Sequence, residues 1–405
     1  MSERLAAVSF VVFVLFALSQ PALAAPPIFV GNGTAASCTE TALGDALVIA
    51  ATVGGGAIRF KCGREPITIE LTATLIPPDD TMINGNGLIT LTSIDVLPLV
   101  FVSSDTTVVL NDLSLVVPEL PSSDPAVYGV LNQGTLTVKK STFRNLTGVG
   151  SFVFCCPGIR NQGTLTIDDS TFSGNGTFDK GAAILNEGTL TVKNSEFLGN
   201  QAGLSGGAIY NVGTLTVRNS TFSGNAALFE FGGGIYNIGG SATVAHSTFF
   251  GGFAGIGGGA IWGGLVSVHN SEFSSNLASF FGGAVGGASL TVKNSTFSNN
   301  HVCCSFGDGG AIYGGGTIQN STFSDNFAYH DGGAIWGGGT IQNSTFSGNV
   351  ADHFGGAIFD FGSSIENSTI TQNTAGVAGG GIYNAGTLSL TRTSVTGNTP
   401  DDIFP

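Results

Sequence analysis

A short motif recurs along most of this chain, and this repetition constrains the fold more than any other feature. The segment Gly-Thr-Leu-Thr-Val begins at Gly134 and returns at Gly163, Gly188 and Gly213. Weaker copies begin at positions 240, 264, 288, 314, 337, 361 and 386. The mean spacing is about 25 residues, the length of one supersecondary unit in a repeat protein. We therefore expect a solenoid in which each repeat forms one coil.

Each repeat contains three short segments in a fixed order. The first, at residues 135–138, alternates apolar and polar residues as a strand does. The second, at residues 219–225, is a polar turn that brings Phe222 into the core. The third, at residues 206–211, again alternates. Three short strands in each coil predict an all-β chain with the architecture of a three-sided parallel β-helix.

Stacked coils would align equivalent residues in columns along the axis. We expect one internal column of Phe, at positions 143, 172, 197, 222, 249, 273, 297, 323 and 346. We expect a second, hydrogen-bonded internal column of Asn, at positions 194, 219, 270, 294, 320, 343 and 367. The 63 Gly residues suit the sharp corners of such coils. No window sustains apolar residues at helical spacing, so we expect no helix.

The repeat resembles that of the chlamydial polymorphic outer membrane proteins, which carry the motifs FxxN and GGA followed by Ile, Leu or Val. FxxN begins at Phe172, Phe197, Phe222, Phe273, Phe297, Phe323 and Phe346. GGAI or GGAV begins at Gly206, Gly258, Gly282, Gly309, Gly332 and Gly355, and GGGI variants end at Ile235 and Ile382. The resemblance covers residues 134–398 and implies a surface-exposed, adhesin-like protein. More broadly, the chain resembles the pectin-lyase-like superfamily, which implies a right-handed parallel β-helix of about 13 coils.

The N-terminal region differs from the repeats. Residues 1–24 resemble a signal peptide, with Arg4, an apolar run and the small-residue site Ala22-Leu23-Ala24. We expect residues 25–105 to form a cap and the first coils, and residues 106–405 to form the repeats. The mature chain should be secreted or held at the cell surface, without a transmembrane span. Only eight residues follow Gly397, so we expect no anchoring domain of the resembled family.

Six cysteines agree with an oxidising compartment. Cys38 and Cys62 both lie outside the repeats, and we expect a disulfide between them. Two vicinal pairs, Cys155-Cys156 and Cys303-Cys304, admit strained disulfides, free thiols or links to another chain.

Charge excludes one class of partner. The chain has 13 Lys+Arg against 27 Asp+Glu, for a net charge of -14. Nucleic acid is therefore not expected as a partner, because no basic surface can neutralise phosphates. Between positions 219 and 391 the only basic residue besides His is Lys293, which disfavours a polysaccharide lyase that removes a proton with Arg or Lys.

Carboxylates and histidines gather in the loops before three successive Gly-Gly segments. The candidate catalytic residues there are Asp308, His330, Asp331, Asp352 and His353, and Asp360 follows the third segment. Carboxyls in adjacent and alternate coils would bracket the roughly 6.5 to 9.5 Å spacing of an inverting glycosidase. The same loops also fit a merely solvated polar surface, which we favour, or a metal site to which His301 would contribute. We assign no residue as a metal ligand and expect no cofactor.

Two further surfaces are candidates for binding. An aromatic residue follows the Gly-Gly-Ala-Ile segment in most coils and is expected to point outward, at Tyr210, Tyr236, Trp262, Tyr313, Trp336, Phe359 and Tyr383, with a gap at Gly286. This aromatic column either stacks against sugar rings or simply covers the core. The pairs Thr135/Thr137, Thr164/Thr166, Thr189/Thr191 and Thr214/Thr216 resemble the arrays of ice-binding solenoids, although Thr is also common in ordinary strands.

The favoured hypothesis is a non-catalytic, adhesin-like or carbohydrate-binding protein whose partner is an extracellular polysaccharide or a cell-surface glycan. The first alternative is an extracellular, inverting, Asp-based polysaccharide hydrolase. Ice binding is the less favoured alternative. The oligomeric state is left open.

Overall fold

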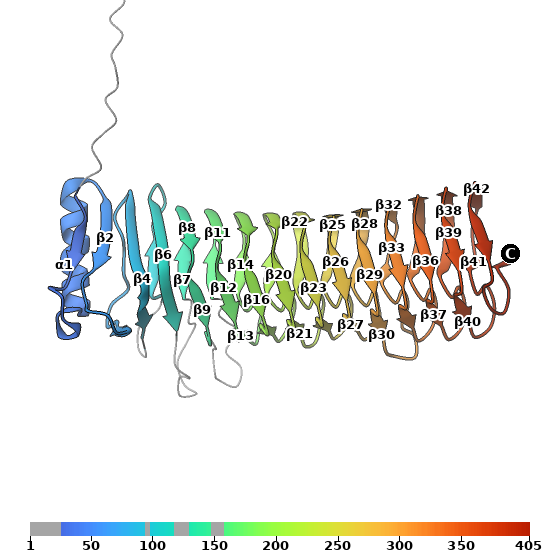
Figure 1. The fold of residues 1–405 in the computed structure, drawn as a ribbon, viewed down its shortest axis with the longest axis horizontal. Coiled ribbons are helices and arrows are strands. Elements are labelled where there is room, and N and C mark those ends of the chain that lie inside the picture. Colours follow the sequence, from blue (N-terminus) through green and yellow to red (C-terminus); the bar gives the residue numbers. More distant parts are fainter. Residues whose placement is uncertain (1–25, 94–97, 117–128, 147–157) are drawn as a thin grey trace, which may run out of the picture.

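The computed structural model describes residues 26–93, 98–116, 129–146 and 158–405. The chain winds into a long cylinder of about 13 stacked coils, with a helix at the N-terminal end and the C-terminus at the other end (Figure 1). The predicted parallel β-helix is confirmed. The predicted signal peptide at residues 1–24 and the pair Cys155-Cys156 lie outside the described residues.

Three columns of strands run along the cylinder and belong to one 35-stranded sheet. Within the repeats, the first column begins with β7 (Val130–Asn132), β10 (Ile159–Asn161), β14 (Ile184–Asn186) and β18 (Ile209–Asn211). The second begins with β8 (Thr135–Lys139), β11 (Thr164–Asp168), β15 (Thr189–Lys193) and β19 (Thr214–Arg218). In later coils these two columns often merge, in β22 (Ile235–Ala245), β25 (Ile261–His269), β28 (Val285–Lys293), β35 (Ile335–Gln342) and β38 (Ile358–Glu366). They are separate in β31 (Ile312–Tyr313) and β32 (Gly316–Gln319), and in β41 (Ile382–Asn384) and β42 (Leu388–Thr391).

The third column contains the Phe of each FxxN motif. Its strands are β9 (Thr142–Arg144), β12 (Thr171–Ser173), β16 (Glu196–Leu198), β20 (Thr221–Ser223), β23 (Thr248–Phe250), β26 (Glu272–Ser274), β29 (Thr296–Ser298), β33 (Thr322–Ser324), β36 (Thr345–Ser347), β39 (Thr369–Thr371) and β43 (Ser394–Thr396). Pairing is parallel and joins equivalent residues of successive coils, as Thr164 pairs with both Thr135 and Thr189. The recurring motif therefore sets the register, and differences in coil length are taken up in the loops.

A fourth column of two-residue strands forms a separate nine-stranded sheet. It contains β13 (Gly176–Thr177), β17 (Gln201–Ala202), β21 (Ala226–Ala227), β24 (Phe253–Ala254), β27 (Leu277–Ala278), β30 (His301–Val302), β34 (Phe327–Ala328), β37 (Val350–Ala351) and β40 (Thr374–Ala375). The sequence predicted only three strands per coil, because two residues are too few to show alternation.

The N-terminal coils are built from longer strands and a helix. The strands there are β1 (Ile28–Val30), β2 (Gly56–Phe60), β3 (Ile67–Glu70), β4 (Thr81–Thr92), β5 (Val100–Val102) and β6 (Thr107–Val116), and a 3-10 turn covers Ala35–Ser37. At the C-terminal end of the cylinder, the last strand is β44 (Ile403–Phe404). The expectation of no helix is wrong, since α1 (Glu40–Val53) packs against β1 and β2. Its buried residues Leu43, Ala46, Leu47 and Ala50 do follow helical spacing. Thr39 accepts a hydrogen bond from the Ala42 N–H at its start, and Gly54 ends it in a left-handed conformation.

The predicted Phe column is confirmed as the centre of the core. Its nine rings, from Phe143 to Phe346, are at most 2% exposed. Successive ring centroids are 4.6–5.0 Å apart and the rings are stacked. Stacking at the coil spacing follows directly from parallel, in-register pairing.

The prediction for the Asn column is wrong about burial, although several of the predicted residues do hydrogen-bond from rung to rung through their amides at 3.0–3.3 Å. The predicted residues, such as Asn194 and Asn219, are exposed and occupy corners with φ of 48–51°. One buried ladder instead consists of the Asn three residues after the inward apolar residue of the third-column strand, from Asn175, which closes an FxxN motif, to Asn398, which follows Val395. Their Nδ2 groups donate to the Oδ1 of the next rung at 2.8–3.0 Å. Asn tolerates the left-handed corner, so the frequency of this residue does not distinguish the two positions.

Candidate functional site

The loop between the fourth-column strand and the Gly-Gly segment carries the candidate catalytic residues. Bridges and backbone hydrogen bonds align one loop position through eight coils, at Ser205, Phe231, Gly257, Phe281, Asp308, Asp331, Phe354 and Ala378. Asp308 and Asp331 are therefore adjacent rungs of one column. Asp352 does not align with them. Its N–H donates to the carbonyl of Ala328, so Asp352 lies level with the residue after Ala328, two positions before Asp331. The expected equivalence of the three carboxylates is wrong for Asp352, which is exposed.

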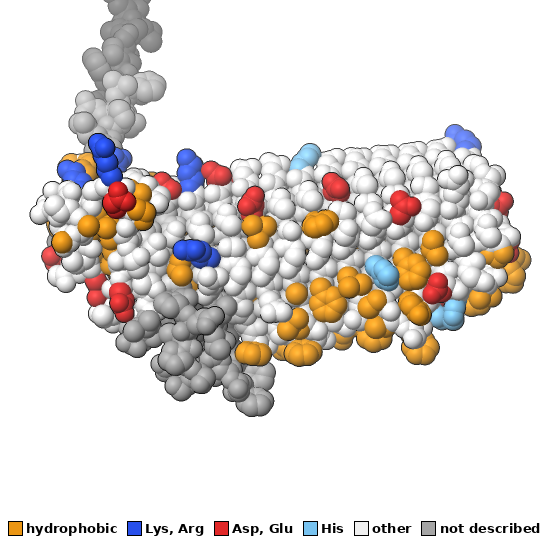
Figure 2. Space-filling view, turned by 60° about the horizontal axis from the view of Figure 1, so that its bottom comes forward, with side chains coloured by type: hydrophobic (Ala, Val, Ile, Leu, Met, Phe, Trp, Pro, Cys, Tyr) orange, Lys and Arg blue, Asp and Glu red, His pale blue; other side chains and the backbone are white. Residues whose placement is uncertain are grey.

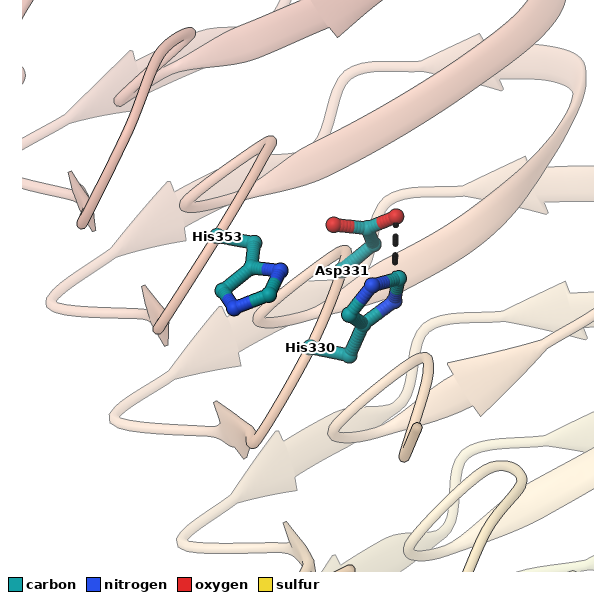
Figure 3. Close-up of side chains that lie close together, drawn as sticks. All are labelled: His330, Asp331 and His353. Carbon is teal, nitrogen blue, oxygen red and sulfur yellow. Dashed lines mark ion pairs between the residues drawn. The ribbon is translucent and has the colours of Figure 1, made fainter. Parts of the chain in front are cut away.

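One histidine holds the two aligned carboxylates together. His330 Nδ1 lies 2.9 Å from Asp308 Oδ1 and 3.2 Å from Asp331 Oδ2. The backbone fixes the carboxylates, since the Asp331 N–H donates to Asp308 Oδ1 and the Phe354 N–H donates to Asp331 Oδ1. Figure 3 shows His330 and His353 on adjacent coils, with Asp331 beside both rings. Their ring centroids are 4.6 Å apart.

Burial dominates the electrostatics of this cluster. It raises the pKa of the Asp308 carboxyl, although the hydrogen bond and charge of His330 act in the opposite direction. It also raises the pKa of Asp331, again against the influence of His330. Both carboxyls therefore hold a proton more readily than ordinary surface carboxyls.

The spacing does not match the geometry that would support inverting hydrolysis. The two carboxylate oxygens contact a single nitrogen atom, so they lie closer together than the roughly 6.5 to 9.5 Å that leaves room for a water. The His330 ring occupies the space between them. The catalytic roles of Asp308, Asp331, Asp352, His330 and His353 stay predictions.

The aromatic column is a stack of rings along the axis. Tyr210 and Tyr236 have centroids 5.3 Å apart, Tyr313 and Trp336 are 4.4 Å apart and nearly parallel, and Phe359 follows Trp336 at 6.3 Å. Tyr210 is only 7% exposed. Because the rings cover one another, this geometry favours the covering role over sugar stacking. Sugar binding by the column is untested.

Trp262 bridges the apparent gap in that column. Its ring lies 6.0 Å from Tyr313 although Gly286 separates the two in register. A Cβ at Gly286 would be 2.2 Å from the Trp262 ring. The glycine is therefore the space into which the indole packs.

A second set of aromatics was missed from the sequence. Five exposed side chains lie in the loops after fourth-column strands, at Phe178, Phe229, Phe280, Phe306 and Tyr329, and we call this set the loop ridge. Phe306 is 73% and Phe229 67% exposed. Figure 2 shows hydrophobic side chains gathered along one long side of the C-terminal half, with His and acidic side chains among them. The sequence feature that could have predicted the loop ridge is an aromatic residue that recurs a few positions before the Gly-Gly segment.

The Thr array forms aligned rungs on another face. Thr164 pairs with Thr135 and Thr189, and the second Thr of each pair aligns likewise. The first Thr of each rung is exposed and the second is half-buried. Ice binding is untested.

The predicted Cys38–Cys62 disulfide is confirmed, with its Cα atoms 5.7 Å apart. Cys303 and Cys304 are free thiols with sulfurs 3.8 Å apart. The part of the chain that the structure describes contains no helix long and apolar enough to cross a bilayer.

Parts of the sequence match the models of two known families. Residues 129–264 match the model of the right-handed β-helix region. Residues 320–338 and 343–360 match the Chlamydia polymorphic membrane protein repeat. The chain is a right-handed β-helix protein with repeats of the polymorphic membrane protein type. No curated protein matches this β-helix protein closely enough to count as a relative.

Two solved structures resemble the β-helix protein weakly. The A-module of mannuronan C-5 epimerase AlgE6 from Azotobacter vinelandii has a TM-score of 0.40 and 12% identity, covering 93% of this chain and 97% of that one. The catalytic unit of an α-1,3-glucanase from Streptomyces thermodiastaticus has a TM-score of 0.38 and 15% identity, covering 93% and 69%. At these scores neither carries an argument about activity.

Proposed function

We propose that this β-helix protein is a secreted or surface-held, non-catalytic and adhesin-like protein that binds an uncharged glycan against its loop ridge. The observation that carries the proposal is the row of exposed aromatic side chains. Exposed apolar patches on a folded protein mark interaction sites. The ridge residues are mounted on stacked, hydrogen-bonded coils, so little conformational entropy is lost when a ligand binds.

The chemistry of the ridge supports a repetitive, uncharged ligand. Coils repeat at about 4.8 Å along the axis, so a repeating polymer meets similar contacts in successive coils. The net charge of -14 and the scarcity of Lys and Arg after Asn219 disfavour nucleic acid and anionic polysaccharides. Aromatic rings with exposed faces suit sugar rings better than the mutually stacked aromatic column does.

The test is binding of the mature, purified protein to an array of neutral glycans, compared with the triple variant Phe229→Ala/Phe306→Ala/Tyr329→Ala. The matched control is Ile238→Ala/Phe250→Ala/Leu265→Ala, which removes three exposed apolar side chains from strands outside the loops. We expect the ridge variant to lose at least about tenfold in affinity and the control to bind like the parent.

Two outcomes would overturn the proposal. One is that no neutral glycan binds, or that the ridge variant binds as the parent does. The other is the release of new reducing ends that disappears in Asp308→Asn/Asp331→Asn. That second result would identify a hydrolase at the Asp/His loops.

A further inference from the structure

His330, Asp331 and His353 form a cluster that the proposed glycan-binding function does not use. His330 and Asp331 lie in the loop between β34 and β35, and His353 lies in the next coil, between β37 and β38. The His353 N–H donates to His330 O at 3.0 Å, which places the two loops directly against each other. One nitrogen or oxygen atom of each side chain lies within 4.8 Å of the others. Figure 3 shows the three side chains lying close together.

The distance between His330 Nδ1 and Asp331 Oδ2 is that of two neighbouring ligand atoms around a metal ion. Zn²⁺ binds His nitrogen and carboxylate oxygen at about 2.0–2.2 Å, which puts two ligand atoms about 3.4 Å apart in a tetrahedral site. His330 Nδ1 and Asp331 Oδ2 are 3.2 Å apart. His353 is exposed, so its side chain has room to rotate toward the other two ligands.

The surroundings hold these ligands in place and balance the charge of a divalent ion. Asp331 is 5% exposed, and its other oxygen accepts the Phe354 N–H. Asp308 Oδ1 lies 2.9 Å from the same His330 Nδ1, which places it within reach as a fourth ligand. Two carboxylates balance one divalent cation, whereas a protonated His330 balances only one of them.

We propose that His330, Asp331 and His353 bind one divalent transition-metal ion of the zinc type, with Asp308 supporting the site. Two imidazoles with carboxylate oxygen suit Zn²⁺, Cu²⁺ or Ni²⁺, whereas Ca²⁺ and Mg²⁺ prefer all-oxygen sites. The ion ties two adjacent coils together beside the loop ridge. Metal binding here does not require that the ridge bind a glycan.

The test is calorimetric titration of the untagged mature protein with Zn²⁺, and separately with Ca²⁺. All four cysteines of the two vicinal pairs, Cys155, Cys156, Cys303 and Cys304, are replaced beforehand by serine, because vicinal thiols also bind zinc. We expect one Zn²⁺ per chain, no comparable binding of Ca²⁺, and visible absorption bands of tetrahedral Co²⁺ when Co²⁺ replaces Zn²⁺.

Variants separate the site from casual binding by surface histidines. His330→Ala/His353→Ala should weaken Zn²⁺ binding at least tenfold, and so should His353→Ala alone, which alters only an exposed side chain. The matched control is His246→Ala/His269→Ala, which removes two His from strand ends on another face. Absence of stoichiometric Zn²⁺ binding, or equal binding by the His330→Ala/His353→Ala variant, would overturn the proposal.

Discussion

At the scale of single residues, Asp360 occupies a buried position that other coils fill with Asn or Gly. The first-column ladder runs from Asn132 to Asn237, with amide contacts of 2.6–2.7 Å between rungs. Asp360 pairs in register with Gly337 and Asn384 and is fully buried. One of its oxygens accepts the Ser363 hydroxyl, and within the described residues the other has no partner. Burial raises the pKa of this carboxyl.

Replacing Asp360 with Asn should stabilise the protein by about 1–3 kcal/mol at pH 7, because a buried carboxyl whose ionised form is disfavoured by burial becomes an amide that carries no charge. With a raised pKa in the folded state, the parent is most stable when the carboxyl is protonated and loses that stability as the pH rises through the raised pKa. The advantage of the variant should therefore shrink toward pH 4. Urea unfolding of both proteins from pH 4 to 8 measures it. A variant less stable than the parent at pH 7 would contradict this account.

Gly286 is required by the ring of Trp262. The change Gly286→Ala inserts a methyl group 2.2 Å from that ring, so we expect a loss of about 1–3 kcal/mol from overpacking and a shift in Trp fluorescence. Gly264→Ala is the control, since a Cβ there meets no atom within 4 Å. Equal effects of the two changes would show that backbone freedom, and not ring packing, explains Gly286.

At the scale of elements, the N-terminal cap is held by both a covalent and a polar link. The disulfide joins Cys38, just before α1, to Cys62, just after β2. The Glu40 carboxylate at the start of α1 accepts the N–H groups of Thr72 and Ala73 at 2.6 and 3.0 Å. Burial opposes ionisation of Glu40, but these hydrogen bonds prevail and lower its pKa. The cap covers the otherwise open edge of the first coil.

Replacing both bridged cysteines, Cys38→Ser/Cys62→Ser, should lower stability by about 3 kcal/mol, because the 24-residue separation closes a sizeable loop in the unfolded chain. The comparison is Cys303→Ser/Cys304→Ser, which removes two unbonded thiols and should change stability by less than about 0.5 kcal/mol. Urea unfolding under oxidising conditions measures both. A small effect of the first pair would mean that α1 stays docked without the disulfide.

At the scale of the whole molecule, each coil contacts mainly the coils above and below it, so damage should stay local. Phe297→Ala removes one ring from the stacked column and should cost about 3–5 kcal/mol. In hydrogen exchange by mass spectrometry, we expect lost protection in β26, β29 and β33 but not in β12 or β16. Phe250→Ala, at an exposed ring, is the control. Uniform loss along the cylinder would indicate a single cooperative unit instead.

The repeat by itself determined most of the fold. A motif recurring every 25 residues or so leaves few ways to pair strands, and alternation within Thr135–Lys139 shows which side chains face inward. The Phe column followed from the same repeat, whereas the Cys38–Cys62 bridge was predicted because both cysteines lie outside it. Helix α1 was not predicted, because the prediction relied on repetition and this helix occurs only once. Its helical spacing is nevertheless present in the sequence, at Leu43, Ala46, Leu47 and Ala50.

Only the tertiary structure decided which of several similar residues meet. Asn194 and Asn200 are both repeated Asn, yet the corner geometry exposes one and buries the other. Asp352 precedes a Gly-Gly segment as Asp331 does, but the backbone pairing of the loops shifts it by two residues. The contact of His330 with Asp308 likewise joins adjacent coils. Hydrogen bonds between irregular loops set how those loops align, and no sequence periodicity records them.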